Sequence, residues 1–129
     1  MAKVLVLGGT GMLGAAVADR LAACGYQVVT AARHGADILL DLTEEESLFA
    51  LLAELNPEII VNSAALVNPE NCENDPIGAW QVNAKAVFAL ANYSRESGCK
   101  LVQISTDHYY TGDGERLHRE SDPVCLLNE

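Results

Sequence analysis

The feature that most constrains this chain is a glycine-rich turn at residues 8–14, Gly-Gly-Thr-Gly-Met-Leu-Gly, placed between an apolar run and an amphipathic one. The run before it, residues 3–7, is short and rich in valine and leucine, which is typical of a strand covered on both faces of a parallel sheet. In the run after it, residues 12–23, apolar side chains recur at helical spacing. They are Leu13, Ala16, Val17 and Leu21. The sequence therefore predicts a strand, a glycine turn and a helix in direct succession.

The same alternation continues along the chain. Further strands are predicted at 27–31, 58–62 and 100–105, with a short extended stretch at 37–41, and further helices at 43–55 and from 75 to about 96. The helix at 43–55 has a predicted buried stripe of Leu48, Leu51, Leu52 and Leu55. Strands that alternate with helices at this spacing form parallel crossovers and a doubly wound sheet. With 129 residues, half of them apolar, the chain supports one core. We expect one α/β domain over residues 1–129, with a sheet that stops after about four strands.

Local signals predict where two of the helices begin. Thr43 is placed to act as an N-cap, with Glu46 three residues later to close a capping box. Asp75, followed by proline, is a typical N-cap for the long helix. Residues 63–74 are rich in turn-forming types and are predicted to form a polar loop that binds a ligand. Trp80 lies on the long helix, and its large apolar ring predicts a place in the core or in an interface.

Charge and cysteine content exclude several classes of function. The formal net charge is −10 and only eight residues are lysine or arginine, so the chain cannot supply the basic patch that nucleic acids or anionic membranes require. The glycines at 8–14 interrupt the apolar N-terminus before a signal segment or membrane span could form. The four cysteines form no C-x-x-C pair, which predicts reduced thiols and no metal site. We expect a cytoplasmic protein.

The glycine turn carries the first functional prediction. Glycines let the backbone approach a pyrophosphate closely, and the unpaired N–H groups and positive end of the following helix stabilise its charge. We predict that Gly8, Thr10, Gly11 and Gly14 shape such a site. The alternative is a glycine-rich turn that binds nothing.

The end of the second predicted strand bears on which dinucleotide is bound. An acidic residue there would bond the adenosine ribose hydroxyls of NAD and repel a 2′-phosphate. This chain has Ala31, Ala32 and Arg33 instead. A guanidinium pairs well with a phosphate, so the sequence favours NADP(H) over NAD(H). The alternative is that Arg33 is a solvated surface residue.

Glycines three residues apart at 8–14 resemble those of the short-chain dehydrogenase/reductase family. Later segments make the chain similar to the extended, sugar-nucleotide members of that family, the dTDP-4-dehydrorhamnose reductases and their relatives. These segments are Asn62-Ser63-Ala64-Ala65, Cys72-Glu73, Val82-Asn83, Ile104-Ser105-Thr106-Asp107 and Gly112. The resemblance covers nearly the whole chain and implies a Rossmann-type doubly wound parallel sheet with an NAD(P) cofactor.

The resemblance also implies roles for single residues around the cofactor. Gly11, Met12 and Leu13 should meet the pyrophosphate. Asp41 and Leu42 should lie against the adenine, with the carboxylate accepting from its amino group; on sequence alone, Asp41 is equally well read as an ordinary acidic residue ahead of a helix. The residues expected on the ribose and nicotinamide side are Ala64, Ala65, Leu66 and, on the long helix, Asn83.

Ser105 and Thr106 lie at the end of the last predicted strand, where ligands of open α/β sheets bind. Their hydroxyls are candidates to donate to a substrate carbonyl and polarise it for hydride attack, with Asp107 expected to bind substrate. In the family, the threonine works with the tyrosine and lysine of a Y-x-x-x-K motif. No tyrosine in this sequence has a lysine four residues later. Residues 122–129 resemble the stretch just before that tyrosine, so we expect the natural chain to continue and this stretch alone to be inactive.

The resemblance implies an oxidoreductase that transfers hydride between NADP(H) and a nucleotide-linked 4-keto sugar. Two alternatives stay open: an epimerase or dehydratase acting on a nucleotide sugar, which would share this cofactor-binding half, and a non-catalytic NAD(P)-binding regulatory subunit. We also expect self-association, for example as a homodimer, because the sheet edge beyond the last predicted strand should expose apolar surface.

Overall fold

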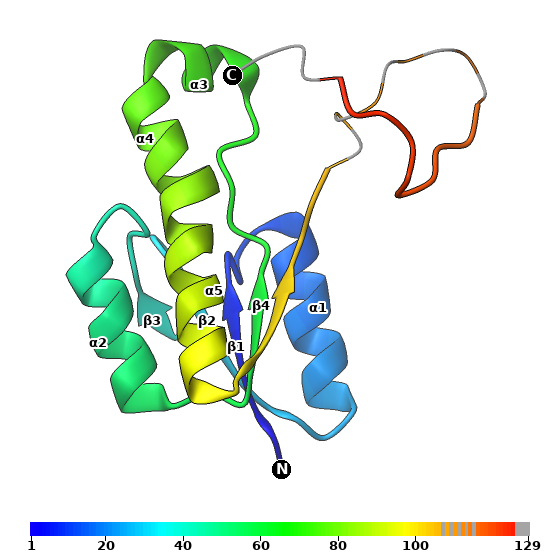
Figure 1. The fold of residues 1–129 in the computed structure, drawn as a ribbon. Coiled ribbons are helices and arrows are strands. Elements are labelled where there is room, and N and C mark those ends of the chain that lie inside the picture. The colour runs from blue at the N-terminus through cyan, green and yellow to red at the C-terminus, as the bar shows by residue number, and fades with distance from the viewer. Residues whose placement is uncertain (107, 109, 111, 113, 115, 126–129) are drawn as a thin grey trace.

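The computed structural model describes residues 1–106, 108, 110, 112, 114 and 116–125, and its centre is an all-parallel, five-stranded sheet (Figure 1). The strands are β1 (Lys3–Leu7), β2 (Gln27–Ala32), β3 (Ile38–Leu39), β4 (Ile59–Asn62) and β5 (Lys100–Gln103). Their order across the sheet is β3-β2-β1-β4-β5. Successive strands are added outward on one side of β1 and then on the other, which confirms the predicted doubly wound sheet. The stretch expected to be extended at 37–41 forms a strand of only two residues.

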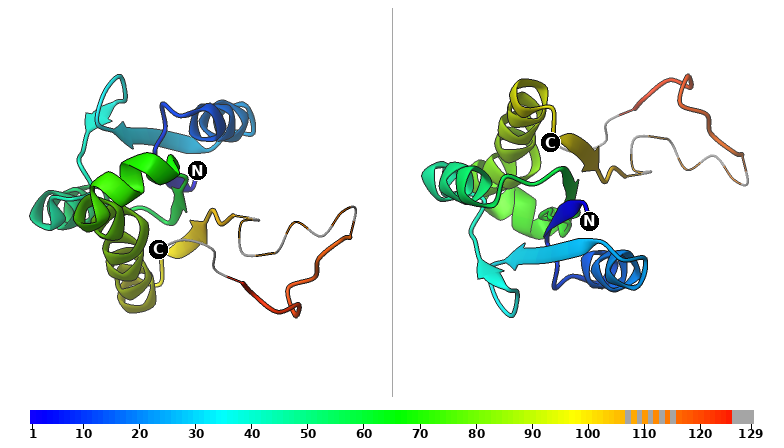
Figure 2. Two further views of the ribbon diagram at one scale, coloured as in Figure 1. Left: turned by 90° about the horizontal axis from the view of Figure 1, so that it is seen from above. Right: turned by 90° about the horizontal axis from the view of Figure 1, so that it is seen from below.

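Helices cover both faces of this sheet. They are α1 (Met12–Ala23), α2 (Glu45–Leu55), α3 (Pro69–Asn74), α4 (Pro76–Trp80) and α5 (Ala86–Ser97), with a π-helical segment (Gln81–Lys85) joining the last two. Figures 1 and 2 show α1 on one face, and α2 and α5 on the other. None of the helices in the described part of the chain is both long and apolar enough to cross a membrane.

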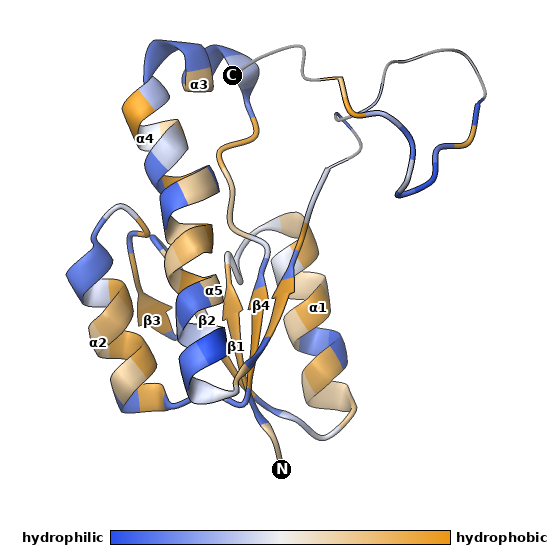
Figure 3. Cartoon of the chain, in the orientation of Figure 1, coloured by the Kyte–Doolittle hydropathy of each residue, from blue (hydrophilic) through white to orange (hydrophobic). Residues whose placement is uncertain are grey.

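The central strand β1 is apolar throughout because it faces helices on both sides. Leu5 and Leu7 belong to the larger core, which lies under α2 and α5, whereas Val4 and Val6 belong to a smaller core under α1. All four side chains are at most 1% exposed. The strands are the most uniformly hydrophobic part of the ribbon in Figure 3. This burial on both faces is why the sequence of β1 shows a continuous apolar run with no alternation.

Helix α1 contacts the sheet through only part of the predicted stripe. Val17 and Leu21 are partly buried against the smaller core, as predicted. The buried residues of α1 are Gly14 and Ala18, whereas Leu13 is 45% exposed and Ala16 is also exposed. Small residues at the contact let the helix approach the strands closely, so the larger Leu13 is turned outward. In α2, by contrast, the predicted stripe is confirmed, with its buried residues at Leu48, Leu51 and Leu52.

The capping box predicted at the start of α2 is wrong. The N-cap is Glu44, without a side-chain cap, and Thr43 instead donates its N–H and hydroxyl to the carboxylate of Asp41, at 2.9 and 2.8 Å. A β-turn-like Asx contact thus competes successfully with the helix for the hydroxyl of Thr43. The predicted loop at 63–74 also needs correction, because its second half is the short helix α3, whose cap Asn68 accepts from the N–H of Asn71 at 3.1 Å.

The long helix begins as predicted and then departs from regular geometry. Asp75 accepts from the N–H of Gly78 at 3.0 Å and is the N-cap of α4. Helical structure then runs without a break to Ser97 through the π-helical segment, a change of hydrogen-bond pattern for which periodicity gives no signal. Trp80 is 57% exposed, so its predicted place in the core is wrong, and a place in an interface stays a prediction.

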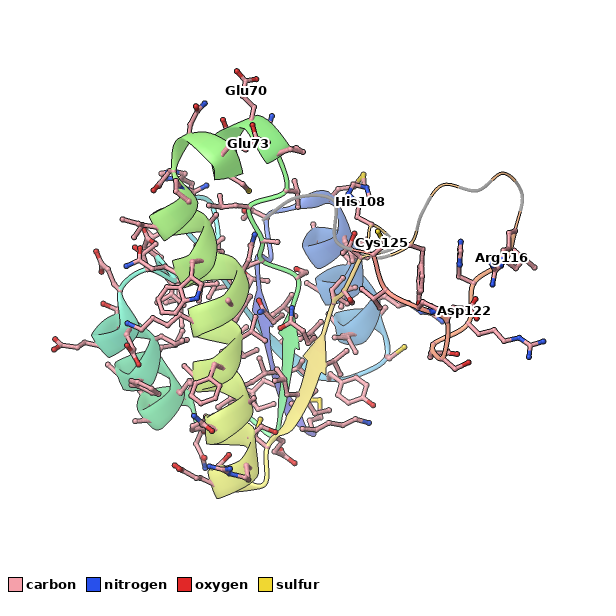
Figure 4. All side chains as sticks on the ribbon, turned by 45° about the horizontal axis from the view of Figure 1, so that its top comes forward. Glu70, Glu73, His108, Arg116, Asp122 and Cys125 are labelled. Atoms are coloured by element: carbon pink, nitrogen blue, oxygen red, sulfur yellow. The ribbon has the colours of Figure 1, made fainter. Side chains whose placement is uncertain are left out.

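Beyond β5 the described residues form a separate cluster that lies away from the sheet (Figures 1 and 2). The rings of Tyr110 and His118 stack with centroids 4.5 Å apart, and the hydroxyl of Tyr110 donates to the carbonyl of Arg119 at 3.1 Å. Asp122 lies 3.7 Å from Arg116, both of them labelled in Figure 4, and 3.6 Å from His118. The segment is thus held by its own polar contacts.

Candidate cofactor site

A pocket of about 480 Å³ opens at the carboxyl ends of β1, β2 and β4. It lies where the strand order reverses, between β1 and β4, which is the position at which open α/β sheets bind ligands. Its lining comes from the glycine turn, the β2–β3 connection, the residues after β3, the loop after β4 and the long helix. The lining residues are Leu7, Gly8, Thr10, Gly11, Ala31, Ala32, Arg33, His34, Leu40, Asp41, Leu42, Thr43, Ser63, Ala64, Ala65, Leu66, Asp75, Gly78 and Val82.

Close backbone packing fixes the glycine turn on one side of this pocket. Gly8 has a φ of 75°, which favours glycine, and a Cβ at this position would stand 2.8 Å from the amide nitrogen of Ala64. Gly14 lies against the carbonyl oxygen of Gly8, and a Cβ there would overlap that oxygen. The N–H of Gly11 donates back to the same carbonyl at 3.0 Å, which closes the turn. Gly14 therefore shapes the site from behind, without lining the pocket.

The start of α1 points its free N–H groups toward this turn. Its N-cap is Gly11, which provides no side-chain acceptor, so the first-turn amides of the helix have no side-chain cap. An anion at this end would also meet the positive end of the helix dipole. The side chains of Met12 and Leu13 are 94% and 45% exposed and do not line the pocket. Any contribution from these two residues to phosphate binding therefore comes from their backbone.

The opposite wall of the pocket brings Arg33 and Asp41 together. Both line the pocket, and the pKa of Asp41 lies below its ordinary value. The main cause is the hydrogen bond from the N–H of Thr43, followed by that from its hydroxyl, and the nearby guanidinium of Arg33 contributes in the same direction against a small cost of burial. Asp41 is therefore held as an anion with a fixed orientation.

Replacing Thr43 with valine should raise the pKa of Asp41 toward its ordinary value, because the hydroxyl hydrogen bond stabilises the carboxylate form. Because the pKa of Asp41 is lower in the folded protein than in the unfolded chain, this contact stabilises the fold fully at pH values above the ordinary carboxyl pKa. The stabilisation is lost as the pH falls through the lowered pKa of the folded state. NMR titration of the Asp41 side-chain carbon measures the shift. Thr43→Ser keeps the hydroxyl and should keep the low pKa; equal pKa values in all three proteins would contradict the assignment.

The loop after β4 forms the third wall and is fixed by polar contacts at its base. Asn62 is fully buried, donates to Gln103 at 2.8 Å and accepts from the N–H of Ala64 at 3.2 Å. The hydroxyl of Ser63 donates to the carbonyl of Leu7 at 2.8 Å. These bonds tie the loop to the neighbouring strands. Ala64, Ala65 and Leu66 then line the pocket, and their predicted place beside the ribose and nicotinamide stays a prediction.

Asn83 acts on this loop and does not line the pocket. Its side-chain oxygen accepts from the N–H of Leu66 at 2.8 Å, and its side-chain nitrogen donates to the carbonyl of Leu66 at 2.9 Å. The residue lies in the π-helical segment, where the altered winding changes the direction in which side chains leave the helix. The structure therefore places Asn83 as a support for a pocket residue.

Replacing Asn83 with alanine should lower the free energy of unfolding by about 1 kcal/mol, because the N–H and C=O of Leu66 lose their partner and only water can replace it. Urea denaturation measures the change. Asn83→Asp keeps the acceptor for the N–H but loses the donor to the C=O, so its stability should fall between the two. An alanine variant as stable as the wild type would show that the contact has no energetic role.

Two of the three predicted substrate-side residues lie outside the pocket. Ser105 and Thr106 follow β5, are exposed and are not part of the lining. The hydroxyl of Thr106 accepts from the N–H of His108 at 3.2 Å, and His108 is labelled in Figure 4. Asp107 lies outside the described residues. The catalytic and substrate-binding roles of these three residues stay predictions.

Sequence reasoning missed several residues that line the pocket. His34 lines the pocket, and it could have been predicted because it directly follows Arg33, the predicted phosphate-binding residue. Leu40 and Thr43 flank Asp41 and Leu42 on either side. Asp75 and Gly78 come from the start of α4, which reaches the pocket only because the intervening loop folds back over the sheet. No spacing rule connects these last two residues to the glycine turn.

The family model described as the RmlD substrate binding domain matches residues 2–129. The chain belongs to this family. Among curated members, it is 36% identical over 126 residues to the dTDP-4-dehydrorhamnose reductase of Burkholderia thailandensis, covering 98% of this chain and 41% of the relative. It is 32% identical over 124 residues to the spore coat polysaccharide biosynthesis protein SpsK of Bacillus subtilis, covering 96% and 42%. The chain thus spans about two fifths of the length of these relatives.

Two solved structures have the same fold as this chain. The dTDP-4-dehydrorhamnose reductase of Bacillus anthracis in complex with NADP superposes with a TM-score of 0.84 at 28% identity, over 98% of this chain and 44% of that one. The UDP-glucose 4-epimerase of Thermus thermophilus in complex with NAD gives a TM-score of 0.81 at 26% identity, over 98% and 45%. Both superpositions cover nearly the whole of this chain and less than half of the neighbouring structure.

Proposed function

We propose that residues 1–129 are the NAD(P)-binding Rossmann domain of a reductase that acts on a nucleotide-linked 4-keto sugar. The observation that carries the proposal is the convergence of three features in one pocket. These are an uncapped helix start behind a glycine turn, a carboxylate held as an anion by Thr43, and an arginine at the end of β2. The named reductases among its relatives supply the substrate class.

In this proposal each wall of the pocket contacts one part of the dinucleotide. Backbone amides at Gly11, Met12 and Leu13 bind the pyrophosphate, and Asp41 accepts from the adenine amino group. The small side chains of Ala64 and Ala65 leave room for the ribose and nicotinamide, and Asn83 keeps this loop in place through its bonds to Leu66. When bound, the cofactor supplies the hydride.

On the substrate side, we propose that the hydroxyls of Ser105 and Thr106 donate to the keto oxygen and that Asp107 contacts the sugar nucleotide. A hydrogen bond to a carbonyl oxygen stabilises the negative charge that develops there during hydride attack. The proton that completes the alcohol would come from another group, in line with the tyrosine implied by the resemblance. The epimerase alternative is supported by the likeness to the Thermus epimerase, and it would use the same pocket.

The proposed cofactor is NADP(H) in preference to NAD(H). Arg33 lines the pocket at the end of β2, and His34 lies next to it, whereas the strand itself ends in two alanines. A cation at this end attracts a 2′-phosphate, and no carboxylate on this strand end repels it. The NADP complex of the Bacillus anthracis reductase is consistent with this preference.

Binding should be tested on residues 1–129 with both cofactors, and turnover on the natural protein that contains them, with a dTDP-linked 4-keto sugar, because residues 1–129 alone are expected to be inactive. We expect NADPH to bind in the micromolar range and to be oxidised in step with reduction of the sugar, followed by loss of absorbance at the nicotinamide band and by product chromatography. Sugar inversion without net cofactor oxidation would support the epimerase instead. Binding without any turnover would support a regulatory subunit, and no binding of either cofactor at millimolar concentration would reject the proposal.

We further propose a homodimer, or another self-associated form, in the cytoplasm, where the free thiols of the four cysteines are stable. On the α1 face of the sheet, no helix of the described residues covers β5, and Val102 and Ile104 are 37% and 38% exposed. Charged replacements at both positions, Val102→Lys and Ile104→Lys, should lower the apparent mass measured by light scattering at micromolar concentration. A monomer already in the wild type would contradict the prediction.

A further inference from the structure

A set of hydrogen bonds outside the pocket lining joins the two ends of the loop that carries Arg33 and His34. Thr30, in β2, donates both its N–H and its hydroxyl to one carboxylate oxygen of Asp37, at 2.9 and 2.8 Å. The N–H of Asp37 donates back to the hydroxyl oxygen of Thr30 at 3.1 Å. We call these three bonds the Thr30–Asp37 clamp. The clamp closes a short loop of residues 31–36 across its base.

The sheet by itself gives this loop little support. Strand β3 has two residues and lies at the edge of the sheet, and it pairs with β2 only through Ala31 with Ile38 and Ala32 with Leu39. Thr30 precedes the first of these pairs, so its N–H gains from Asp37 an acceptor that β3 does not provide. Because so short an edge strand is a weak constraint, the clamp supplies much of what fixes the loop.

The clamp also contacts the glycine turn. Gly9 is packed so closely on Thr30 that a Cβ at Gly9 would stand 2.6 Å from the Cβ of Thr30. Across the same contact, a Cβ at Gly35 would stand 3.6 Å from the methyl carbon of Thr10. Thr30 is therefore packed directly on the glycine turn, and the loop lies beside that turn at Gly35. A change at Thr30 is expected to alter how the loop lies relative to the turn.

The charge on Asp37 keeps the clamp intact at neutral pH. Its pKa lies below the ordinary value, chiefly because of the hydrogen bond from the N–H of Thr30 and then that from its hydroxyl. The ionised carboxylate is an acceptor for both donors at once, and bonds to a charged acceptor are shorter and stronger than neutral ones. Neither Thr30 nor Asp37 lines the pocket, whereas Arg33 and His34 between them do.

We infer that the Thr30–Asp37 clamp is a positioning element for cofactor choice, which holds Arg33 and His34 beside the glycine turn where both meet the adenosine 2′-phosphate of NADP(H). The inference rests on the proposed function, namely that this pocket binds a nicotinamide dinucleotide. Thr30 and Asp37 act through the loop and do not touch the cofactor. Loss of the clamp should therefore weaken NADPH selectively, because NADH has no 2′-phosphate for the loop to hold.

Two substitutions at Thr30 distinguish the effect of losing its hydroxyl from the effect of losing its packing against Gly9. Thr30→Val keeps the branched shape against Gly9 but removes the hydroxyl, and Thr30→Ser keeps the hydroxyl but removes the methyl group. We expect Thr30→Val to weaken NADPH about tenfold, as for the loss of one well-placed charge-assisted contact, with NADH within about twofold of the wild type. Thr30→Ser should restore the wild-type ratio of the two dissociation constants. Asp37→Ala should reproduce the valine result if Thr30→Val proves too unstable to purify.

The possible results test the role of the Thr30–Asp37 clamp separately from the binding of a nicotinamide dinucleotide by the pocket. Dissociation constants come from fluorescence or calorimetric titration, and circular dichroism with thermal melting shows that each variant is folded. A wild type that prefers NADPH, with a ratio left unchanged by Thr30→Val and Asp37→Ala, overturns the role of the clamp and leaves the proposed function standing. Equal weakening of both cofactors, or a serine variant as impaired as the valine one, also overturns it. A wild type that binds neither cofactor overturns the proposed function, and the inference with it.

Discussion

Replacement of Gly14 by alanine should weaken NADPH binding by about a hundredfold and lower the free energy of unfolding by about 2 kcal/mol, the usual cost of overpacking a tight contact. Helix propensity alone predicts the opposite sign, since alanine in a helix is about 1 kcal/mol more favourable than glycine. The steric overlap at Gly14 outweighs the gain in helix propensity. The added methyl would overlap the carbonyl oxygen of Gly8, which is backbone and cannot rotate away. Helix α1 must then move off the turn and take its first-turn N–H groups with it.

Gly112 offers a control for this substitution, because a Cβ there meets no atom of the described residues within 4 Å and its φ is not in the left-handed region. Gly112→Ala should leave both stability and cofactor affinity close to the wild-type values. Urea denaturation gives the free energy of unfolding, and NADPH titration gives the dissociation constant, for the wild type, Gly14→Ala and Gly112→Ala. A Gly14→Ala variant that is more stable than the wild type would show that propensity dominates and that the turn has room to adjust.

Replacement of Arg33 by alanine should weaken NADPH by about ten- to a hundredfold and leave NADH within about twofold, because a charged hydrogen bond to a phosphate contributes about 1.5 to 3 kcal/mol. A loss of affinity for NADPH without a matching loss for NADH is the result that tests the role of Arg33. Arg33 lines the pocket at the end of β2, where only NADP(H) carries a phosphate. The same substitution should raise the pKa of Asp41, since it removes one of the charges that lower it.

Arg95 provides the matched control for a lost arginine. It is exposed in the last turn of α5, next to the start of β5 and thus at the opposite end of the sheet from the pocket. Arg95→Ala should change neither dissociation constant. Comparison of the NADPH to NADH ratio in the three proteins measures the effect, and higher salt should weaken NADPH binding in the wild type more than in Arg33→Ala. If Arg33→Ala keeps the wild-type ratio, the guanidinium is a surface group and the NADP preference is unsupported.

Local patterns were sufficient where the physical cause is itself local. The apolar run of β1 and the stripe of α2 were readable because burial acts on residues at fixed spacing. The N-cap at Asp75 was readable because the acceptor and the N–H it binds are three residues apart. Thr43 failed this kind of reasoning because two nearby partners compete for one hydroxyl, and only their relative geometry shows that Asp41 binds it.

The same distinction holds within the candidate site. Gly8, Arg33 and Asp41 were predicted in the pocket and line it, since each lies at the carboxyl end of a strand and parallel strands bring those ends together. The role of Asn83 was not accessible, because its partner Leu66 is seventeen residues away and the contact requires a π-helical segment. Met12 and Leu13 were assigned as single residues, but the structure turns their side chains outward and leaves only their backbone to face a phosphate.

The order of residue types along the chain was enough to specify the parallel α/β sheet and the place of its glycine turn, because both follow from periodicity and from the steric freedom of glycine. The tertiary structure alone decided which residues of α1 are turned away from the sheet, which carboxylate binds the hydroxyl of Thr43, and how Thr30 and Asp37 close the loop beside the turn. These outcomes depend on distances between segments brought together by folding. Residue spacing along the chain carries no information about distances of that kind.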